Sequence, residues 1–306
     1  MKNNYKKFMG MMPIMPTPIL ENGDPDIAST ERIVDYLMAS NPACIGHMGG
    51  ASEYFKVAED DREPILKATI ERVAGRVPVF VGVTALSVKQ SLKNARQAYE
   101  LGADMLMVCS PVTAPMEQHE LLKFYHAVAE ETPLPIIIQD TGASANAYTA
   151  EFMAELCKKI PTAGYVKAEG ANFLRKTVDL QNLLGDDVQV IGGAAGFHML
   201  QLLRQNVTAF MTGTEAIELH GAVVHSFLSG EIDKAIDLYY TTVLPYLTIY
   251  NLSYNHMLKY MLKRRGIITN DEILFPYDAK PTDPLILQEF EYIMDRIEKD
   301  KIAIRK

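Results

Sequence analysis

The chain has 306 residues, with 48% hydrophobic residues and 30 Lys and Arg against 38 Asp and Glu, a formal net charge of −8. This acidic balance argues against the basic surface that binds nucleic acids, and no apolar run approaches the roughly 18 residues of a membrane span. The three cysteines, Cys44, Cys109 and Cys157, have no CxxC spacing, which is typical of buried thiols in a reducing compartment. We therefore expect a cytoplasmic globular protein that binds neither nucleic acid nor membrane.

Short apolar runs alternate with amphipathic stretches along the first 230 residues. We expect strands within 12–19, 44–50, 77–84, 105–111, 135–140, 164–170, 188–193 and 209–214, followed in turn by helices at 29–40, 58–75, 87–102, 116–132, 149–160, 172–185, 196–205 and 216–230. The strand runs are apolar throughout rather than alternating, which indicates strands covered on both faces. Eight strand–helix units predict an α/β fold of the (β/α)₈ TIM-barrel type. A doubly wound open sheet usually carries GxGxxG after its first strand, and this chain has PTPI there.

The pattern changes after residue 230, where helical segments follow one another with no strand between them. We expect a catalytic barrel over residues 1–230 and a C-terminal helical extension, residues 231–306, packed on it. Pro245 is expected to interrupt the first helical segment of this extension.

Reactive groups of a barrel enzyme stand at the carboxyl ends of its strands. The residues found there are Thr17, residues 47–53, Thr84, Ser110, Gln139, Asp140, Lys167, Glu169, Gly192, Gly193 and Thr212. We therefore take the candidate site from this set.

Lys167 is the strongest candidate because it lies within an apolar strand run, GYVKAEG, where a charge needs a partner or a function. A lysine in a pocket of low dielectric loses proton affinity, and its free amine can attack a carbonyl carbon to form a Schiff base. The alternative is a structural lysine that pairs with a carboxylate, for which Glu169 or Glu53 would serve.

Two further residues are expected beside Lys167. Glu169 follows two positions later, so both side chains point to the same side of a strand. Its carboxylate could shuttle protons, or it could be only the counter-ion of the lysine. Gln139 ends the fifth strand, next to the sixth in a barrel. Its amide can only form hydrogen bonds, so it could orient a hydroxyl or a water, or simply cap the strand end.

A glycine-containing loop follows the second strand. Gly49, Gly50, Ala51 and Ser52 could direct backbone N–H groups, and the Ser52 hydroxyl, at a substrate carboxylate. A plain turn is the alternative.

Gly192, Gly193 and Thr212 follow the seventh and eighth strands, where many barrels bind phosphate. The backbone N–H groups that bind phosphate there could equally bind a carboxylate or a hydroxyl-rich chain. The seven histidines form no HxH or HExxH pattern, so no metal site is expected.

The order of these motifs resembles the dihydrodipicolinate synthase/N-acetylneuraminate lyase family. The shared features are a GxxxE-type loop after strand two, a GAD before strand four with SP at its end (102–111), a lysine in strand six and a GG after strand seven. The resemblance covers essentially the whole chain. It implies a (β/α)₈ barrel with a C-terminal helical extension, usually a homotetramer, or else a dimer. It also implies a Schiff base between Lys167 and a small 2-keto acid, with no metal or organic cofactor.

The chain departs from the usual pattern of this family at several positions. Gln139 and Asp140 replace the family's strand-five tyrosine, and Gly50 replaces the first threonine of its GTTGE-like loop, so the tyrosine–threonine proton relay is missing. The stretch SPVTAP lacks the aromatic residue that crosses the subunit interface. Ser144 lies near the point where dihydrodipicolinate synthases carry an arginine for a second carboxylate. These losses argue against the condensation reaction that dihydrodipicolinate synthases catalyse.

The chain is similar to one subgroup, the 2-keto-3-deoxy-L-arabonate dehydratases. The similarity rests on Gln139 in IQD, on Lys167 and Glu169 in KxE with 28 residues from Gln139 to Lys167, and on Ser52 and Glu53 in the loop. It implies a lyase that dehydrates an acyclic 2-keto-3-deoxy sugar acid to 2-oxoglutarate semialdehyde, with Glu169 as acid/base. Three alternatives stay open: a pyruvate-dependent class I aldolase, a barrel that binds keto acids without turnover, and a phosphosugar enzyme.

Overall fold

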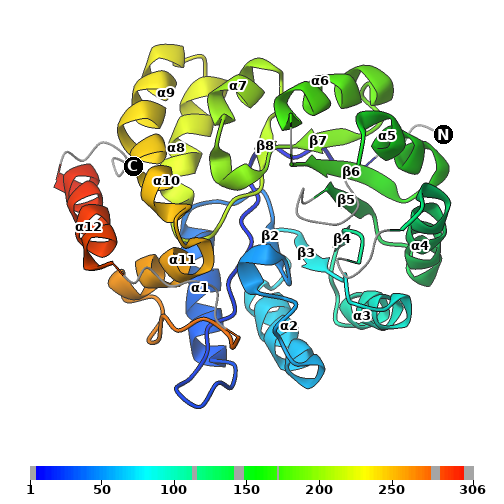
Figure 1. Ribbon diagram of the computed structural model, residues 1–306, viewed down its shortest axis with the longest axis horizontal. Helices are drawn as coiled ribbons and strands as arrows, with labels where there is room; N and C mark the ends of the chain where they lie inside the picture. Colours follow the sequence, from blue (N-terminus) through cyan, green and yellow to red (C-terminus); the bar gives the residue numbers. More distant parts are fainter. Residues whose placement is uncertain (1–4, 112–115, 141–147, 171, 277–282, 300–306) are drawn as a thin grey trace.

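Eight parallel strands form a barrel in the computed structural model, which describes residues 5–111, 116–140, 148–170, 172–276 and 283–299 (Figure 1). The strands are β1 (Gly10–Met11), β2 (Ile45–His47), β3 (Val79–Gly82), β4 (Met105–Val108), β5 (Ile136–Asp140), β6 (Ala163–Ala168), β7 (Gln189–Ile191) and β8 (Ala209–Phe210). β2 to β7 pair in chain order, and β1 pairs with β8. Single bridges from Ile14 to Gly46 and from Gly192 to Phe210 close the ring, so the predicted TIM-barrel fold is confirmed.

The helices that follow the strands surround the barrel (Figure 1). They are α1 (Ile27–Ala39), α2 (Glu59–Val73), α3 (Val88–Glu100), α4 (Gln118–Glu131), α5 (Ala150–Lys159), α6 (Phe173–Leu184), α7 (Met199–Arg204) and α8 (Ile217–Leu228). Several begin where the sequence predicts. Thr149 caps α5 by accepting a hydrogen bond from the Phe152 N–H at 3.2 Å, as its position before an amphipathic run indicates.

The first strand is the element that differs most from its predicted range, 12–19. β1 spans only Gly10–Met11, and the chain after it is joined to its neighbours by the bridge residue Ile14 and by separate backbone hydrogen bonds, such as that from the Met15 N–H to the Gly46 carbonyl at 2.8 Å. Pro13, Pro16 and Pro18 occupy the rest of the range and have no N–H to donate to a ladder. The apolar character of this segment therefore reflects burial and not a continuous strand.

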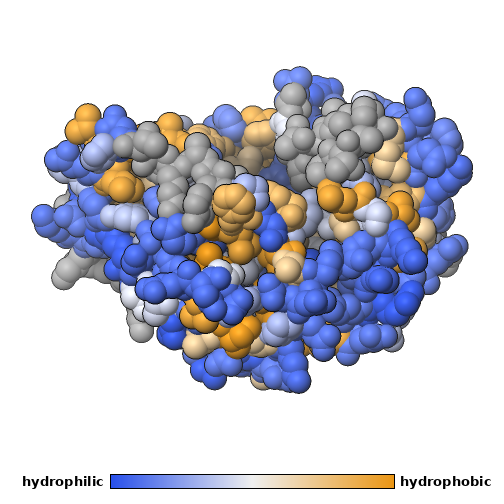
Figure 2. All heavy atoms as spheres, turned by 60° about the horizontal axis from the view of Figure 1, so that its bottom comes forward, coloured by the Kyte–Doolittle hydropathy of each residue, from blue (hydrophilic) through white to orange (hydrophobic). Residues whose placement is uncertain are grey.

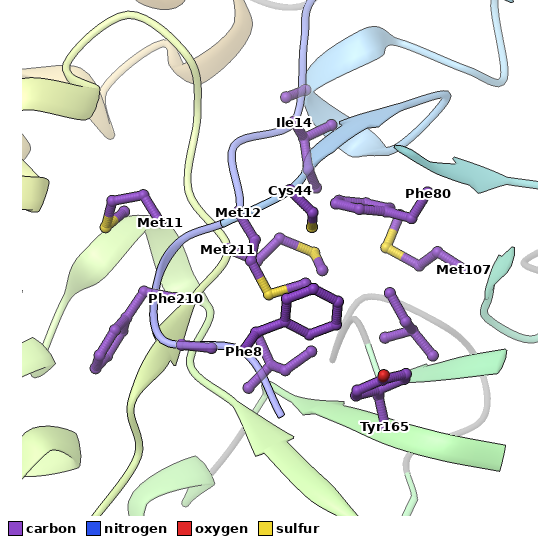
Figure 3. Packing of buried hydrophobic residues seen from close by; sticks show 14 of the residues in the cluster. Phe8, Met11, Met12, Ile14, Cys44, Phe80, Met107, Tyr165, Phe210 and Met211 are labelled. Atoms are coloured by element: carbon purple, nitrogen blue, oxygen red, sulfur yellow. The ribbon is translucent and has the colours of Figure 1, made fainter. Parts of the chain in front are cut away.

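Methionine, cysteine and aromatic side chains fill the barrel interior. Figure 3 shows Met12, Cys44, Phe80 and Met211 directed at one another inside the ring of strands, and all four are buried. Gly46 makes room for this packing, since a Cβ there would lie 1.9 Å from the Phe80 ring. Flexible methionine side chains fill an irregular interior well, so these side chains form a packed core inside the barrel.

Helices alone follow α8 in the described part of the chain: α9 (Ile232–Leu238), α10 (Leu244–Tyr250), α11 (Tyr254–Arg264) and α12 (Pro284–Lys299). They gather on one side of the barrel, beside α8 and α1 (Figure 1). The α-helical pattern is interrupted next to Pro245, as predicted, but the helix does not end there. The chain stays helical through a π-helical segment, η3 (Tyr239–Val243), that leads into α10. A widened turn accommodates a proline ring and its missing N–H without ending the helix.

A buried ion pair ties α11 to the barrel. Lys259 Nζ lies 2.7 Å from Glu53 Oε1, and both side chains are at most 1% exposed. Glu53 also pairs with Lys56 at 3.4 Å and accepts the Leu274 N–H at 2.8 Å. Glu53 therefore joins the loop after β2 to the C-terminal helices.

Hydrophilic side chains cover most of the face seen in Figure 2, with hydrophobic residues gathered in smaller patches between them. Among the helices of the described segments, none is both long and apolar enough to cross a membrane. The three cysteines are buried and unpaired, as their apolar surroundings in the sequence predict.

Candidate active site

A cavity of about 360 Å³ brings most of the predicted residues together at the carboxyl ends of the strands. Six of them line it: Gly50, Ala51, Gln139, Lys167, Glu169 and Thr212. They come from four strand ends and the loops that follow them, those of β2, β5, β6 and β8, as the barrel topology requires. The rest of the wall includes residues from the segments that follow β1, β7 and β8 and, unexpectedly, polar residues from the C-terminal helical region.

Lys167 lies near the end of β6, where it is paired in register with Gln139 of β5 and Ile191 of β7. The residue is 5% exposed. Its Nζ lies 3.1 Å from Glu169 Oε2 and lines the same cavity as that carboxylate. Of the two carboxylates expected as possible partners of Lys167, Glu169 is the one that contacts it, because Glu53 is engaged by Lys259 and Lys56.

Three donors converge on the Glu169 carboxylate. Oε2 accepts from Gln139 Nε2 at 3.1 Å and faces Lys167 Nζ, while Oε1 accepts the backbone N–H of Ala194 at 2.7 Å. Convergent donors of this kind fix the position of a carboxylate. Glu169 therefore stands beside the lysine as a partly exposed acceptor that can take up or return a proton at the cavity.

Asp140, the residue after Gln139, has a different role from its neighbour. Successive residues of a strand point to opposite faces, so Gln139 lines the cavity while Asp140 forms an ion pair with Lys176 of α6. Lys176 also donates to the backbone carbonyl of Glu169 at 3.2 Å. The Asp140–Lys176 pair therefore holds the segment that carries Glu169.

Gly192 and Gly193 do not line the cavity but make room behind it. A Cβ at Gly193 would lie 2.6 Å from Glu169 Oε1, and a Cβ at Gly192 would lie 2.5 Å from the Phe210 ring. Only glycine fits at either position without displacing a neighbour. These two glycines therefore let Glu169 and Phe210 approach the backbone, and their direct contact with substrate stays a prediction.

The loop after β2 forms a short 3₁₀ turn, η1 (Gly50–Ser52). The Ser52 hydroxyl donates to the Met15 carbonyl at 2.5 Å and accepts the Gly49 N–H at 3.1 Å. Ser52 and Gly49 thus stabilise the loop from behind, and Gly50 and Ala51 present its backbone to the cavity. The hydroxyl predicted to contact substrate is used within the loop.

Three polar cavity residues were not found from the sequence. Tyr54 follows η1, and its hydroxyl lies 4.0 Å from Cys109 Sγ. Asn251 and Tyr254 come from the end of α10 and the start of α11. Burial raises the pKa of Tyr54 and of Tyr254, so both hydroxyls are neutral donors. Tyr54 directly follows the predicted loop, but no pattern in the sequence brings Asn251 and Tyr254 to the strand ends.

The other residues at the strand ends stabilise loops or are buried. Thr84 bonds the Cys109 backbone with its hydroxyl, and Thr17 donates to the Ser52 carbonyl at 2.7 Å. Burial, together with the charge of Arg62, lowers the pKa of His47 to about 3. Ser144 lies outside the described residues.

No metal centre is found in the part of the chain that the structure describes: no three His, Cys, Asp or Glu side chains there gather closely enough to hold an ion. The expectation that the enzyme needs no metal stays a prediction.

With this geometry in place, comparison with known proteins decides the family. The profile of the dihydrodipicolinate synthetase family matches residues 7–292. The chain belongs to the dihydrodipicolinate synthetase family. The resemblance found in the sequence is therefore confirmed, and it extends from before β1 into α12.

Individual members of the dihydrodipicolinate synthetase family agree with this assignment. The chain is 27% identical over 299 residues to L-2-keto-3-deoxyarabonate dehydratase of Azospirillum brasilense, covering 91% of this chain and 96% of the relative. It is 28% identical over 239 residues to a 4-hydroxy-tetrahydrodipicolinate synthase of Thermotoga neapolitana, covering 76% and 80%.

Solved structures share the fold. The 4-hydroxy-tetrahydrodipicolinate synthase of Methylacidiphilum fumariolicum SolV superposes with a TM-score of 0.89 at 20% identity, over 97% of this chain and 98% of that one. The N-acetylneuraminate lyase of Mycoplasma synoviae superposes with a TM-score of 0.82 at 19% identity, over 96% and 99%. The family and its named members identify the protein as an enzyme of the lyase class.

Proposed function

We propose that this enzyme dehydrates an acyclic 2-keto-3-deoxy sugar acid, of the 2-keto-3-deoxy-L-arabonate type, to 2-oxoglutarate semialdehyde. The observation that carries the proposal is the meeting of Lys167, Glu169 and Gln139 in one cavity. The likeness to a dehydratase of that name supports it, as does the replacement of the family's strand-five tyrosine by Gln139.

The reaction begins with a covalent bond to Lys167. Its nitrogen attacks the C2 carbonyl carbon of the substrate, two of its protons leave with the carbonyl oxygen as water, and the resulting iminium withdraws electrons from C3. A base then removes a proton from C3 to give an enamine. Glu169, whose carboxylate lies 3.1 Å from the lysine nitrogen, is the group placed to move these protons.

Dehydration follows from the enamine. Its electrons expel the C4 hydroxyl, which takes a proton from Glu169 and leaves as water. Loss of a proton from C5 and tautomerisation turn the C5 alcohol into an aldehyde, and hydrolysis of the imine returns the Lys167 amine. The net change is the loss of one water. Gln139 would orient the leaving hydroxyl or a water by hydrogen bonding.

We place the two ends of the substrate on opposite walls of the cavity. The C1 carboxylate would lie against the backbone of Gly50 and Ala51, in the loop that Ser52 stabilises. The hydroxyl-bearing end would lie toward Thr212 and Tyr254, whose hydroxyls suit a polyol. Both assignments predict raised KM values for substitutions on the corresponding wall.

We further propose that Lys167 supplies the electron sink without a metal or organic cofactor. Turnover should therefore be unchanged after exhaustive treatment with EDTA and dialysis. Recovery of activity only on adding a divalent cation would contradict this. A homotetramer or dimer in the cytoplasm stays a prediction from the family resemblance, and light scattering of the purified enzyme tests the oligomeric state.

Borohydride trapping tests the covalent step. Substrate and borohydride together should leave an adduct whose mass maps to the peptide containing Lys167, and Lys167→Ala should abolish both the adduct and turnover. Lys158→Ala, which removes an exposed lysine at the end of α5, is the matched control and should be trapped like the wild type. Turnover that survives in Lys167→Ala would refute the mechanism.

Analysis of the products distinguishes the proposed dehydratase from the alternative functions. A semialdehyde identifies the dehydratase. Pyruvate plus an aldehyde identifies an aldolase, which shares the same imine but breaks the C3–C4 bond. Tight binding of a keto acid with no trapped adduct would identify a binding protein instead.

A further inference from the structure

The turn between β7 and α7 adopts an unusual backbone conformation. Ala194, Ala195 and Gly196 have consecutive positive φ values of 51°, 53° and 90°. Residues with a side chain seldom adopt this left-handed conformation, and they keep it only where their surroundings impose it. Ala194 and Ala195 also line the candidate active site, so the strained turn is part of its wall.

One side of the turn faces the proposed acid/base. The Ala194 N–H donates to Glu169 Oε1 at 2.7 Å, and the missing Cβ of Gly193 leaves room for the carboxylate. This donor differs from the other two on Glu169. The Lys167 nitrogen becomes bonded to substrate during the proposed reaction, and Gln139 has a flexible side chain, whereas the Ala194 N–H is fixed to the backbone.

The other side of the turn faces His220 of α8. The imidazole Nε2 lies 3.1 Å from the Ala195 carbonyl oxygen, and a Cβ at Gly196 would lie 2.7 Å from the His220 ring. His220 is 1% exposed. The two glycines that flank the alanines thus admit a carboxylate on one side and an imidazole on the other.

Both nitrogens of the His220 ring face carbonyl oxygens. Nδ1 lies 2.9 Å from the Ala216 carbonyl and Nε2 lies 3.1 Å from the Ala195 carbonyl. Tyr246 packs edge-on against the ring. Burial lowers the pKa of His220 more than its two backbone hydrogen bonds raise it, and a neutral ring has one N–H to donate. We assign this N–H to Nε2, because the Ala216 carbonyl already accepts the helical N–H groups of Leu219 and His220.

We propose that His220 is a positioning residue for Glu169. Its Nε2–H holds the Ala195 carbonyl, which keeps the left-handed turn in place and the Ala194 N–H directed at Glu169 Oε1. This inference rests on the proposed function of Glu169 as the acid/base, and it adds a residue from α8 that does not touch the substrate.

The test compares amide side chains of two lengths. A glutamine amide nitrogen reaches about the position of Nε2, whereas an asparagine amide reaches only about that of Nδ1. His220→Gln should therefore retain kcat within about 3-fold of the wild type, while His220→Asn should lower kcat about 10-fold with KM changed less than about 3-fold, since a small misplacement of a catalytic group costs rate more than binding. Borohydride trapping at Lys167 should be unchanged in both.

A second readout does not depend on activity. Hydrogen exchange in the peptide spanning 190–198 should be faster in His220→Asn than in His220→Gln, with a distant peptide as the reference for global stability. Equal kcat in the two variants, or equal exchange, would overturn the role of His220. If the wild type forms no adduct with any 2-keto-3-deoxy acid, the proposed function fails, and the exchange comparison still decides whether His220 holds the turn.

Discussion

A methyl group added at Gly193 should disable the enzyme without unfolding it. The backbone at this position has φ −126°, outside the left-handed region that favours glycine. The Cβ of an alanine, however, would lie 2.6 Å from Glu169 Oε1, where ordinary contact begins at about 3.4 Å. The carboxylate must therefore retreat by about 0.8 Å, which weakens its hydrogen bond from the Ala194 N–H.

A displacement of this size is large for a catalytic group. A misplacement near 1 Å can cost about 100-fold in rate, so we expect Gly193→Ala to lower kcat/KM by roughly 10- to 100-fold, or about 1.4 to 2.7 kcal/mol of transition-state stabilisation. Lys167 is untouched, so the imine should still form. Turnover, measured by mass detection of the product, should therefore fall. Borohydride should still trap the adduct on Lys167.

The matched control is Gly221→Ala in the middle of α8. There the new Cβ meets only Met11 Cγ, at 3.7 Å, and alanine favours a helix by about 1 kcal/mol over glycine. This variant should keep its activity and unfold at an equal or higher temperature. Gly193→Ala with kcat/KM within two-fold of the wild type, or with no adduct, would refute the reasoning about Glu169.

Three further predictions follow from other contacts. Glu169→Gln should lower kcat at least about 100-fold, because general acid–base catalysis contributes that much, and should still form the borohydride adduct; loss of the adduct instead would place Glu169 in imine formation. Glu53→Gln should destabilise the protein by about 3–5 kcal/mol because it leaves the Lys259 ammonium buried without its carboxylate, which corresponds to a fall of about 6 °C in Tm for a chain of this length. The double variant Glu53→Gln/Lys259→Met should recover part of that loss. If its change in Tm in thermal unfolding equals the sum of the changes in the two single variants, the ion pair is contradicted. Burial raises the pKa of Glu215 to about 7, so the folded state holds a proton that the unfolded state releases near pH 4.5. The free energy of unfolding should therefore fall as pH rises from about 4.5 to 7, and Glu215→Gln should remove this slope in urea titrations at several pH values.

Much of the architecture could be predicted because a closed barrel leaves strong marks in a sequence. The inner strands are largely apolar, the outer helices are amphipathic, and strand and helix alternate eight times along the chain. The meeting of Gln139, Lys167 and Glu169 follows from strand order and from the two-residue period of a strand. These local rules decide where the side chains point before any tertiary contact is known.

The errors arise where a residue's role depends on a distant contact. Glu53 lies in the predicted site loop, but its partner Lys259 comes from more than 200 positions later. Gly193 resembles a ligand-binding glycine, and only the position of the Glu169 carboxylate shows that it makes room. Asn251 directly follows α10 and Tyr254 begins α11, and nothing local indicates which end of the barrel these residues meet.

The position of Asn251 and Tyr254 in the chain has a consequence for the C-terminal helices. A chain cut after residue 230 would keep all eight strands but would lack the part of the cavity wall that these two residues form. It would also lack Lys259, the buried partner of Glu53 in the loop after β2. The helices after α8 therefore complete both the pocket and the charge balance behind it.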